Sequence, residues 1–198
     1  MNSIYNYLVT TSIRYNNLVD VEGKELIVNT QVSERDAIYV NRIGQVIATP
    51  LSITTPVEKG DLVVVNHNVF RRWFDVRGRE RNTSSYMDED TYQLSPDLIY
   101  AYKKQNGHWR AMQGFCFVRP ITHRIDRWSV DLELTHMGEL YYKPDDLDID
   151  IGDLVGFRPE SEYAFLLEGT LLYRVRTKDL TWTTKKSVNE LLVLPKSH

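Results

Sequence analysis

The chain has 198 residues, of which 42% are hydrophobic and 26% are charged. These proportions are typical of a soluble globular protein, and the length suffices for one large domain or two small ones. The net charge of −3 argues against bulk electrostatic binding to nucleic acid or to an anionic membrane.

Short runs rich in Val, Ile, Tyr, Phe and Thr recur along the chain and are separated by Gly, Pro, Asn and Asp, which predicts strands. These runs cover residues 3–13, 42–49, 61–70, 97–104, 109–121, 128–135, 138–142, 153–159, 163–176 and 180–184. Glu168-Gly169 lies between two apolar runs and predicts a tight hairpin turn. Only residues 32–37 and 187–194 favour short helices. This succession predicts an all-β fold of small barrels or sandwiches.

A similar sequence of ten residues occurs twice in the chain. Residues 57–66 read VEKGDLVVVN and residues 149–158 read IDIGDLVGFR. In this pattern Gly60 and Gly152 can take positive φ, while Asp61 and Asp153 can accept hydrogen bonds from turn amides. The pattern therefore predicts the same structural turn, leading into a strand, in both places.

The surroundings of the two stretches match as well. Upstream, IGQVIATP (residues 43–50) matches MGELYYKP (residues 137–144), and downstream YQLSPDLIY (92–100) matches YRVRTKDLTW (173–182). Three matches in one order predict a duplicated domain, with a first unit at residues 1–108 and a second at 109–198. The alternative is a pair of unrelated hairpins that share turn chemistry.

The order of motifs resembles a known family. The second copy reads FVRPI, GELYY, IDIGDLVGFRP and LLYRVRTKDLTW, and the first copy follows more loosely with YLVTTSI, ELIVNT, RIGQVIATP, VEKGDLVVVN and YQLSPDLIYAY. This succession resembles the GroES-type co-chaperonins, as a divergent tandem-repeat member of the kind that a bacteriophage encodes. The resemblance implies two tandem small β-barrels of the GroES-like type. It also implies a protein that assists folding by capping the chamber of a GroEL-type chaperonin ring.

The resemblance places a mobile loop at residues 17–44, between the first strand and the glycine-led strand. Within this segment Leu26, Ile27 and Val28 form an apolar triplet flanked by polar residues, and the family's loop implies that they bind the chaperonin. The alternative is an ordinary buried strand over residues 24–32. The corresponding stretch of the second copy is shorter and alternates as a strand does, so we expect no second docking loop there.

Residues 67–90 interrupt the first copy and predict an inserted hairpin. Arg71, Arg72 and Arg77 lie beside Trp73 and Phe74, a combination that can follow a phosphate backbone and stack bases. Because acidic residues dilute the charge and the whole chain is negative, the pattern favours an interface hairpin over a nucleic-acid site. A single-stranded nucleic-acid binder is therefore an alternative function, as is a structural ring or virion-associated assembly protein that binds no chaperonin.

Catalytic and metal chemistry find little support in the sequence. The five histidines are scattered and Cys116 is the single cysteine, so no zinc pattern exists. Cys116 stands between aromatic residues, where a buried inert thiol is expected. No G-x-G-x-x-G motif is present. We therefore expect a protein that is not an enzyme and that uses no cofactor and no metal.

The resemblance and the composition together give the expected setting. A chain with one cysteine forms no internal disulfide, which favours a reducing cytoplasm, the host's if a phage encodes the chain. We expect no signal peptide and no membrane helix, because no apolar run approaches the roughly 20 residues that a span needs. The family's architecture implies a homo-oligomeric ring of seven chains, with the chaperonin as its partner.

Overall fold

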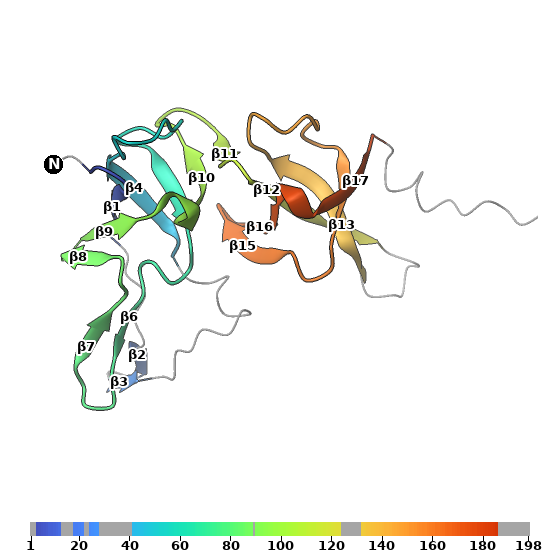
Figure 1. The fold of residues 1–198 in the computed structure, drawn as a ribbon. Coiled ribbons are helices and arrows are strands. Elements are labelled where there is room, and N and C mark those ends of the chain that lie inside the picture. Colours follow the sequence, from blue (N-terminus) through green and yellow to red (C-terminus); the bar gives the residue numbers. More distant parts are fainter. Residues whose placement is uncertain are drawn as a thin grey trace, which may run out of the picture. The chain divides into compact units, whose positions relative to one another are not determined.

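The computed structural model describes residues 3–12, 18–21, 24–27, 41–88, 90–123 and 132–185. The chain divides into two compact units, Met1–Arg110 and Ala111–His198 (Figure 1). The division falls next to the boundary that the sequence predicts between residues 108 and 109. In the described part of the chain, every regular element is a strand except two 3-10 helices of three residues each, so the predicted all-β class is confirmed. The two stretches expected to be helical lie outside the described residues.

Unit 1 is built on a seven-stranded sheet with the order β11-β10-β5-β4-β1-β9-β8. Two hairpins, β2 with β3 and β6 with β7, form two-stranded sheets of their own. The elements run from β1 to β11: β1 (Tyr7–Thr10), β2 (Leu18–Val21), β3 (Lys24–Ile27), β4 (Ile43–Ala48), β5 (Leu62–Val65), β6 (Arg72–Phe74), β7 (Glu80–Asn82), β8 (Tyr86–Asp88), β9 (Thr91–Leu94), η2 (Pro96–Leu98), β10 (Ile99–Lys103) and β11 (Trp109–Ala111).

Unit 2 is built on a six-stranded sheet with the order β15-β16-β12-β13-β14-β17. Its elements are β12 (Phe115–His123), β13 (Leu132–Tyr142), β14 (Leu154–Phe157), β15 (Tyr163–Leu167), β16 (Thr170–Arg176), η3 (Thr177–Asp179) and β17 (Leu180–Thr184). The predicted tight turn is confirmed, because Glu168 and Gly169 both have positive φ, 49° and 80°, between the paired strands β15 and β16. Two positive φ values in a two-residue hairpin loop match the twist of the flanking strands.

The two sheets share one strand order. The order β10-β5-β4-β1-β9-β8 in unit 1 corresponds, strand for strand, to β17-β14-β13-β12-β16-β15 in unit 2. The register corresponds too: Gly44 faces Val63 in unit 1, as Gly138 faces Val155 in unit 2. Both units also carry a register irregularity at the same place: at Leu8/Val9 where β1 pairs with β4, and at Phe117/Val118 where β12 pairs with β13. One topology is therefore built twice along the chain.

The expected closure into barrels is not established. In the described part of the chain, the strands at the two edges of each sheet do not pair with each other, so neither sheet closes through hydrogen bonds. The sequence patterns fix which segments are strands and which neighbours they join. They do not carry the curvature that would bring the edges of one sheet together. The established fold is a pair of open antiparallel sheets.

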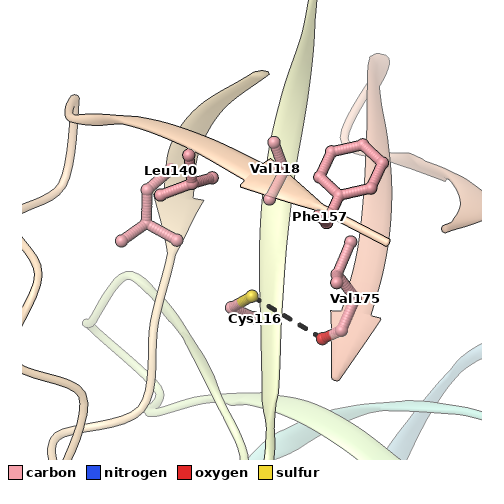
Figure 2. Close-up of a cluster of buried hydrophobic side chains, with 6 residues drawn as sticks. Cys116, Val118, Leu140, Phe157 and Val175 are labelled. Carbon is pink, nitrogen blue, oxygen red and sulfur yellow. Dashed lines mark hydrogen bonds between the residues drawn. The ribbon is translucent and has the colours of Figure 1, made fainter. Parts of the chain in front are cut away.

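The core of unit 2 gathers side chains from β12, β13, β14 and β16 (Figure 2). Its members are at most 3% exposed: Cys116, Val118, Leu140, Val155, Phe157 and Val175. Burying side chains of this size contributes about 1.5–3 kcal/mol each relative to leaving them in water. The Cys116 thiol lies 3.6 Å from the carbonyl oxygen of Val175 and donates to it, and burial raises the pKa of Cys116 to about 12. The predicted buried thiol is confirmed, and at neutral pH it carries almost no thiolate.

Two glycines allow neighbouring strands to approach closely. A Cβ on Gly138 would lie 2.4 Å from Val118 Cγ1 and 2.5 Å from the carbonyl oxygen of Arg119. A Cβ on Gly44 would lie 2.4 Å from Val9 Cγ1. Real Cβ atoms do not approach other atoms this closely, so any larger residue at either position would push two strands apart. The presence of a glycine at this position of β4 and of β13 therefore has a steric reason.

In unit 1, the turn before β5 holds Gly60 at φ 95°, a left-handed conformation that glycine adopts without strain. The Gly60 N–H donates to the carbonyl oxygen of Val46 at 2.8 Å, and the Val46 N–H donates to the carbonyl oxygen of Asp61 at 2.9 Å. The Asp61 carboxylate accepts a hydrogen bond from the backbone N–H of Glu58 at 2.8 Å. These bonds attach β4 to the turn and set where β5 begins.

Unit 2 has the same turn before β14. Gly152 has φ 94°, its N–H donates to the carbonyl oxygen of Leu140 at 2.8 Å, and the Leu140 N–H donates to that of Asp153 at 2.9 Å. The Asp153 carboxylate accepts from the backbone N–H of Asp150 at 3.3 Å. The repeated stretch thus forms one turn, with the same hydrogen bonds, in both units.

Replacing Gly60 or Gly152 with Val should destabilise the unit that contains it by about 1–3 kcal/mol, because a β-branched residue is strained at this φ. The two costs should be similar, since the turn bonds are the same. Urea unfolding of each variant measures them, with Ile151→Val, at an exposed neighbour of Gly152, as the control that changes little. Free tolerance of both glycine substitutions would contradict the shared turn.

Candidate functional site

The candidate loop leaves unit 1 from a fixed base. The Asn41 side-chain amide donates to the Thr11 hydroxyl at 3.0 Å, and the Asn41 side-chain oxygen accepts from the Ile43 N–H at 3.1 Å. The two ends of the segment between Thr11 and Asn41 therefore lie side by side. An open hollow of about 600 Å³ adjoins this base, lined by residues that include Thr11, Asn41 and Asp90.

The apolar triplet falls only partly within the described residues. Leu26 and Ile27 belong to β3, and their backbones pair with Val19 and Leu18 of β2, while Val28 lies outside the described residues. The hairpin of β2 and β3 is a sheet separate from the seven-stranded sheet of unit 1. The backbone of Leu26 and Ile27 is therefore extended, as both the docking interpretation and the strand interpretation require, and the choice between them stays open.

A lysine completes the repeated turn in each unit. Lys104 Nζ lies 3.1 Å from a carboxylate oxygen of Glu58 and 3.1 Å from one of Asp61. Lys185 Nζ lies 2.8 Å from the corresponding carboxylate of Asp150. Burial acts to lower the pKa of Lys104, but its hydrogen bonds to Glu58 and Asp61 outweigh this and raise it. The hydrogen bond from Lys185 lowers the pKa of Asp150.

Sequence reasoning missed these lysines, because the match of DLIYAYKK with DLTWTTKK places Lys103, and not Lys104, opposite Lys185. The strand pairing aligns Lys103 with Thr184, and therefore Lys104 with Lys185. The Lys104 ammonium nitrogen is buried against its carboxylate partners, whereas the pair of Lys185 with Asp150 is exposed, and exposed ion pairs contribute at most about 1 kcal/mol. The predicted turn residues Gly60, Asp61, Gly152 and Asp153 form the same hydrogen-bonded turn in both units.

The predicted insert of residues 67–90 contains a hairpin of β6 and β7, here called the arginine hairpin (residues 69–83; Figure 1). One carboxylate organises its tip. Asp75 Oδ1 accepts from the backbone N–H groups of Arg77 at 2.9 Å and Arg79 at 3.0 Å, and Asp75 Oδ2 accepts from the Arg81 guanidinium at 3.1 and 3.2 Å. The pKa of Asp75 is lowered, first by the hydrogen bond from the Arg79 amide. The tip is thus an ordered turn.

The strands of the hairpin use their arginines internally. The Arg71 guanidinium lies 4.9 Å from the ring centroid of Trp73, and that of Arg72 lies 5.9 Å from the ring centroid of Phe74. Arg72 also lies 3.6 Å from Glu80. Arginines of the hairpin therefore pair with acids of the hairpin itself, and the aromatic rings contact cations of the same segment.

The base of the arginine hairpin is anchored in the core of unit 1. Phe70 is 1% exposed and meets the Tyr92 ring edge-on, with 4.9 Å between centroids. The Thr83 hydroxyl donates to the carbonyl oxygen of Val69 at 2.9 Å across the base. At the other end the Val76 side chain is fully exposed, and Arg77 and Arg79 are exposed as well. The hairpin thus joins a buried root to an exposed cationic tip.

The described residues include no group of three or more His, Cys, Asp or Glu side chains that could hold a metal ion. Among the same residues, no helix is long and apolar enough to cross a bilayer. No family model matches the chain, and no curated protein matches it. The assignment of a function therefore depends on the residues described above and on the resemblance of the motifs.

Replacing Asp75 with Ala should speed amide exchange at Arg77 and Arg79 without lowering the melting temperature of unit 1, because both amides donate to this carboxylate and the tip lies away from the core. Asp88→Ala, in the neighbouring strand β8, is the matched control. The pKa of Asp75 is lowered in the folded state. The stabilisation that its carboxylate gives to the tip is therefore complete above the ordinary aspartate pKa of about 3.9, and it is lost as the pH falls through the lowered pKa. Amide exchange followed by NMR during acid titration measures both effects, and unchanged exchange in Asp75→Ala would contradict the organising role.

Proposed function

We propose that this chain is a co-chaperonin of the GroES type, in which each unit is a GroES-like fold and the whole caps a GroEL-type chaperonin ring without enzymatic activity. The observation that carries the proposal is that one strand order is built twice, with the glycine-aspartate turn in the same position each time. That turn is the motif on which the family resemblance depends. A sheet pair with one repeated turn has no need of a cofactor, and none is part of the proposal.

The loop at residues 17–44 supplies the proposed contact with the chaperonin through Leu26, Ile27 and Val28. Its base is held by the hydrogen bond between Asn41 and Thr11, so the docking segment is presented from a fixed point on unit 1. A segment that becomes ordered on binding gives modest affinity for each contact, since part of the interaction energy offsets lost entropy. Several copies in one ring restore the overall strength through avidity.

The alternative functions differ in one property each. A structural or virion-associated ring protein would assemble in the same way and bind no chaperonin. A single-stranded nucleic-acid binder would use Trp73 and Phe74 as stacking platforms, yet both rings contact arginines of their own hairpin. This internal use of the aromatic faces favours protein contacts over base stacking for the insert.

Replacing Leu26, Ile27 and Val28 together with Ser should abolish chaperonin binding and leave folding and assembly intact, because the triplet supplies the apolar contact. A pull-down with a GroEL-type chaperonin, with and without ATP, measures binding, and thermal melting reports the fold. Leu166→Ser with Leu171→Ser, at two exposed apolar positions of unit 2, is the control that keeps binding. Loss of folding in the triple variant would instead support a buried strand.

Native mass spectrometry should show rings of seven chains. Seven is odd, so chains with two units cannot place both units in equivalent positions of one seven-fold ring. We therefore expect unit 1, which carries the candidate loop, to face the chaperonin, with unit 2 in a separate layer or beside it. A monomer at micromolar concentration, unchanged by chaperonin and nucleotide, would contradict the ring.

A further inference from the structure

The tip of the arginine hairpin presents an unusual combination of side chains. Val76 has a relative exposure of 104%, and the exposed side chains of Arg77 and Arg79 follow it. In the described part of the chain neither guanidinium has an ion-pair partner, because the nearby carboxylate of Asp75 is occupied by Arg81 and by backbone amides. An apolar group beside two cations is thus held ready on an ordered turn, which lowers the entropic cost of binding a partner.

The hairpin is also a local exception in charge. Residues 71–82 contain five arginines and two acids, in a chain whose net charge is −3. The corresponding connection in unit 2, between β14 and β15, is RPESE, with one arginine and two glutamates. The cationic tip therefore belongs to unit 1 alone, and the partner that it fits is an acidic surface with an apolar centre.

Unit 2 carries a surface of that chemistry. Residues 143–153, which lead into β14, contain five aspartates and one lysine. The corresponding segment of unit 1, residues 49–61, contains two acids and one lysine. Within the aspartate-rich segment Ile151 is 62% exposed. A hollow of about 350 Å³ is lined by Asp148, Ile149, Asp150 and Asp153 from this segment, by Thr183 and Thr184 at the end of β17, and by Lys185, which follows that strand.

We propose that the tip of the arginine hairpin of one copy docks at this acidic hollow on the second unit of another copy of the same chain. Arg77 and Arg79 meet Asp148 and Asp150, of which Asp150 also holds its ion pair with Lys185, and Val76 covers the exposed Ile151. The tip and the hollow are complementary in charge, and the tip belongs to unit 1 while the aspartate-rich segment belongs to unit 2, so every copy carries both partners of the contact. Such a contact is heterologous and head-to-tail, and it generates a ring where the rotation closes.

This inference rests on the self-assembly in the proposed function, and it does not depend on chaperonin binding. The test uses the full chain in three forms: Arg77→Glu with Arg79→Glu, Asp148→Lys with Asp150→Lys, and all four changes together. Sedimentation velocity and native mass spectrometry at low salt should show assembly by the wild type, loss of at least tenfold in self-association for each double variant, and recovery in the combined variant. Raised salt should weaken assembly of the wild type, because exposed charges are screened.

Arg158→Glu with Arg176→Glu changes the net charge as much as Arg77→Glu with Arg79→Glu does, but at positions of unit 2 outside the hollow. This control should leave the assembly unchanged. Double variants that assemble like the wild type would overturn the docking and leave the ring and the chaperonin proposal standing. A monomeric wild type would overturn the docking and the ring, while the chaperonin pull-down would still report capping independently. Binding of a single-stranded oligonucleotide that only Arg77→Glu with Arg79→Glu abolishes, with no change in mass, would also overturn the docking and assign the tip to nucleic acid.

Discussion

The hydrogen bonds between β4 and the turn before β5, and their counterparts between β13 and the turn before β14, fix the register on which each sheet depends. Along β4 the buried residues Gly44, Val46 and Ala48 alternate with more exposed ones. A shift of one residue would bring Gln45 into the core and expose Val46. The turn prevents this shift because Gly60 and Asp61 can bond to Val46 in one alignment only. These bonds between a strand and the following turn, β4 in unit 1 and β13 in unit 2, form a seam with a fixed register, and the packing of the other strands follows from it.

Outside this seam the two units have diverged, and some of their differences compensate each other. In unit 1 the pair at one position of the ladder is Val64 with Ala101, and in unit 2 it is Gly156 with Trp182. A Cβ on Gly156 would lie 2.2 Å from Trp182 Nε1, so the indole occupies the space that a side chain would fill. The larger changes, the arginine hairpin and the aspartate-rich segment, lie in connections between strands, where insertions disturb no ladder.

Local patterns predicted most of the fold. Strand positions, the hairpin turn at Glu168-Gly169 and the correspondence of Tyr92 with Tyr173 all follow from alternation, turn chemistry and order along the chain. Openness of the sheets could not be predicted, because it depends on the curvature of strands distant in sequence. The roles of Asp75 and Lys104 also needed three dimensions, since a carboxylate or ammonium group is assigned by the groups that its atoms reach. For the candidate loop, the apolar triplet could be found in the sequence, whereas the hydrogen bond between Asn41 and Thr11 at its base could be found only in the structure.

The single thiol of the chain lies in only one of two similar units. Cys116 is fully buried between the strands of unit 2, and unit 1 has no cysteine. A thiol-directed reagent therefore reacts only when unit 2 opens, whatever unit 1 does at that moment. The reaction rate of Cys116 in the wild-type protein therefore measures how often unit 2 opens. Compared with the rate of global unfolding, this reaction rate shows whether unit 2 opens alone or together with unit 1.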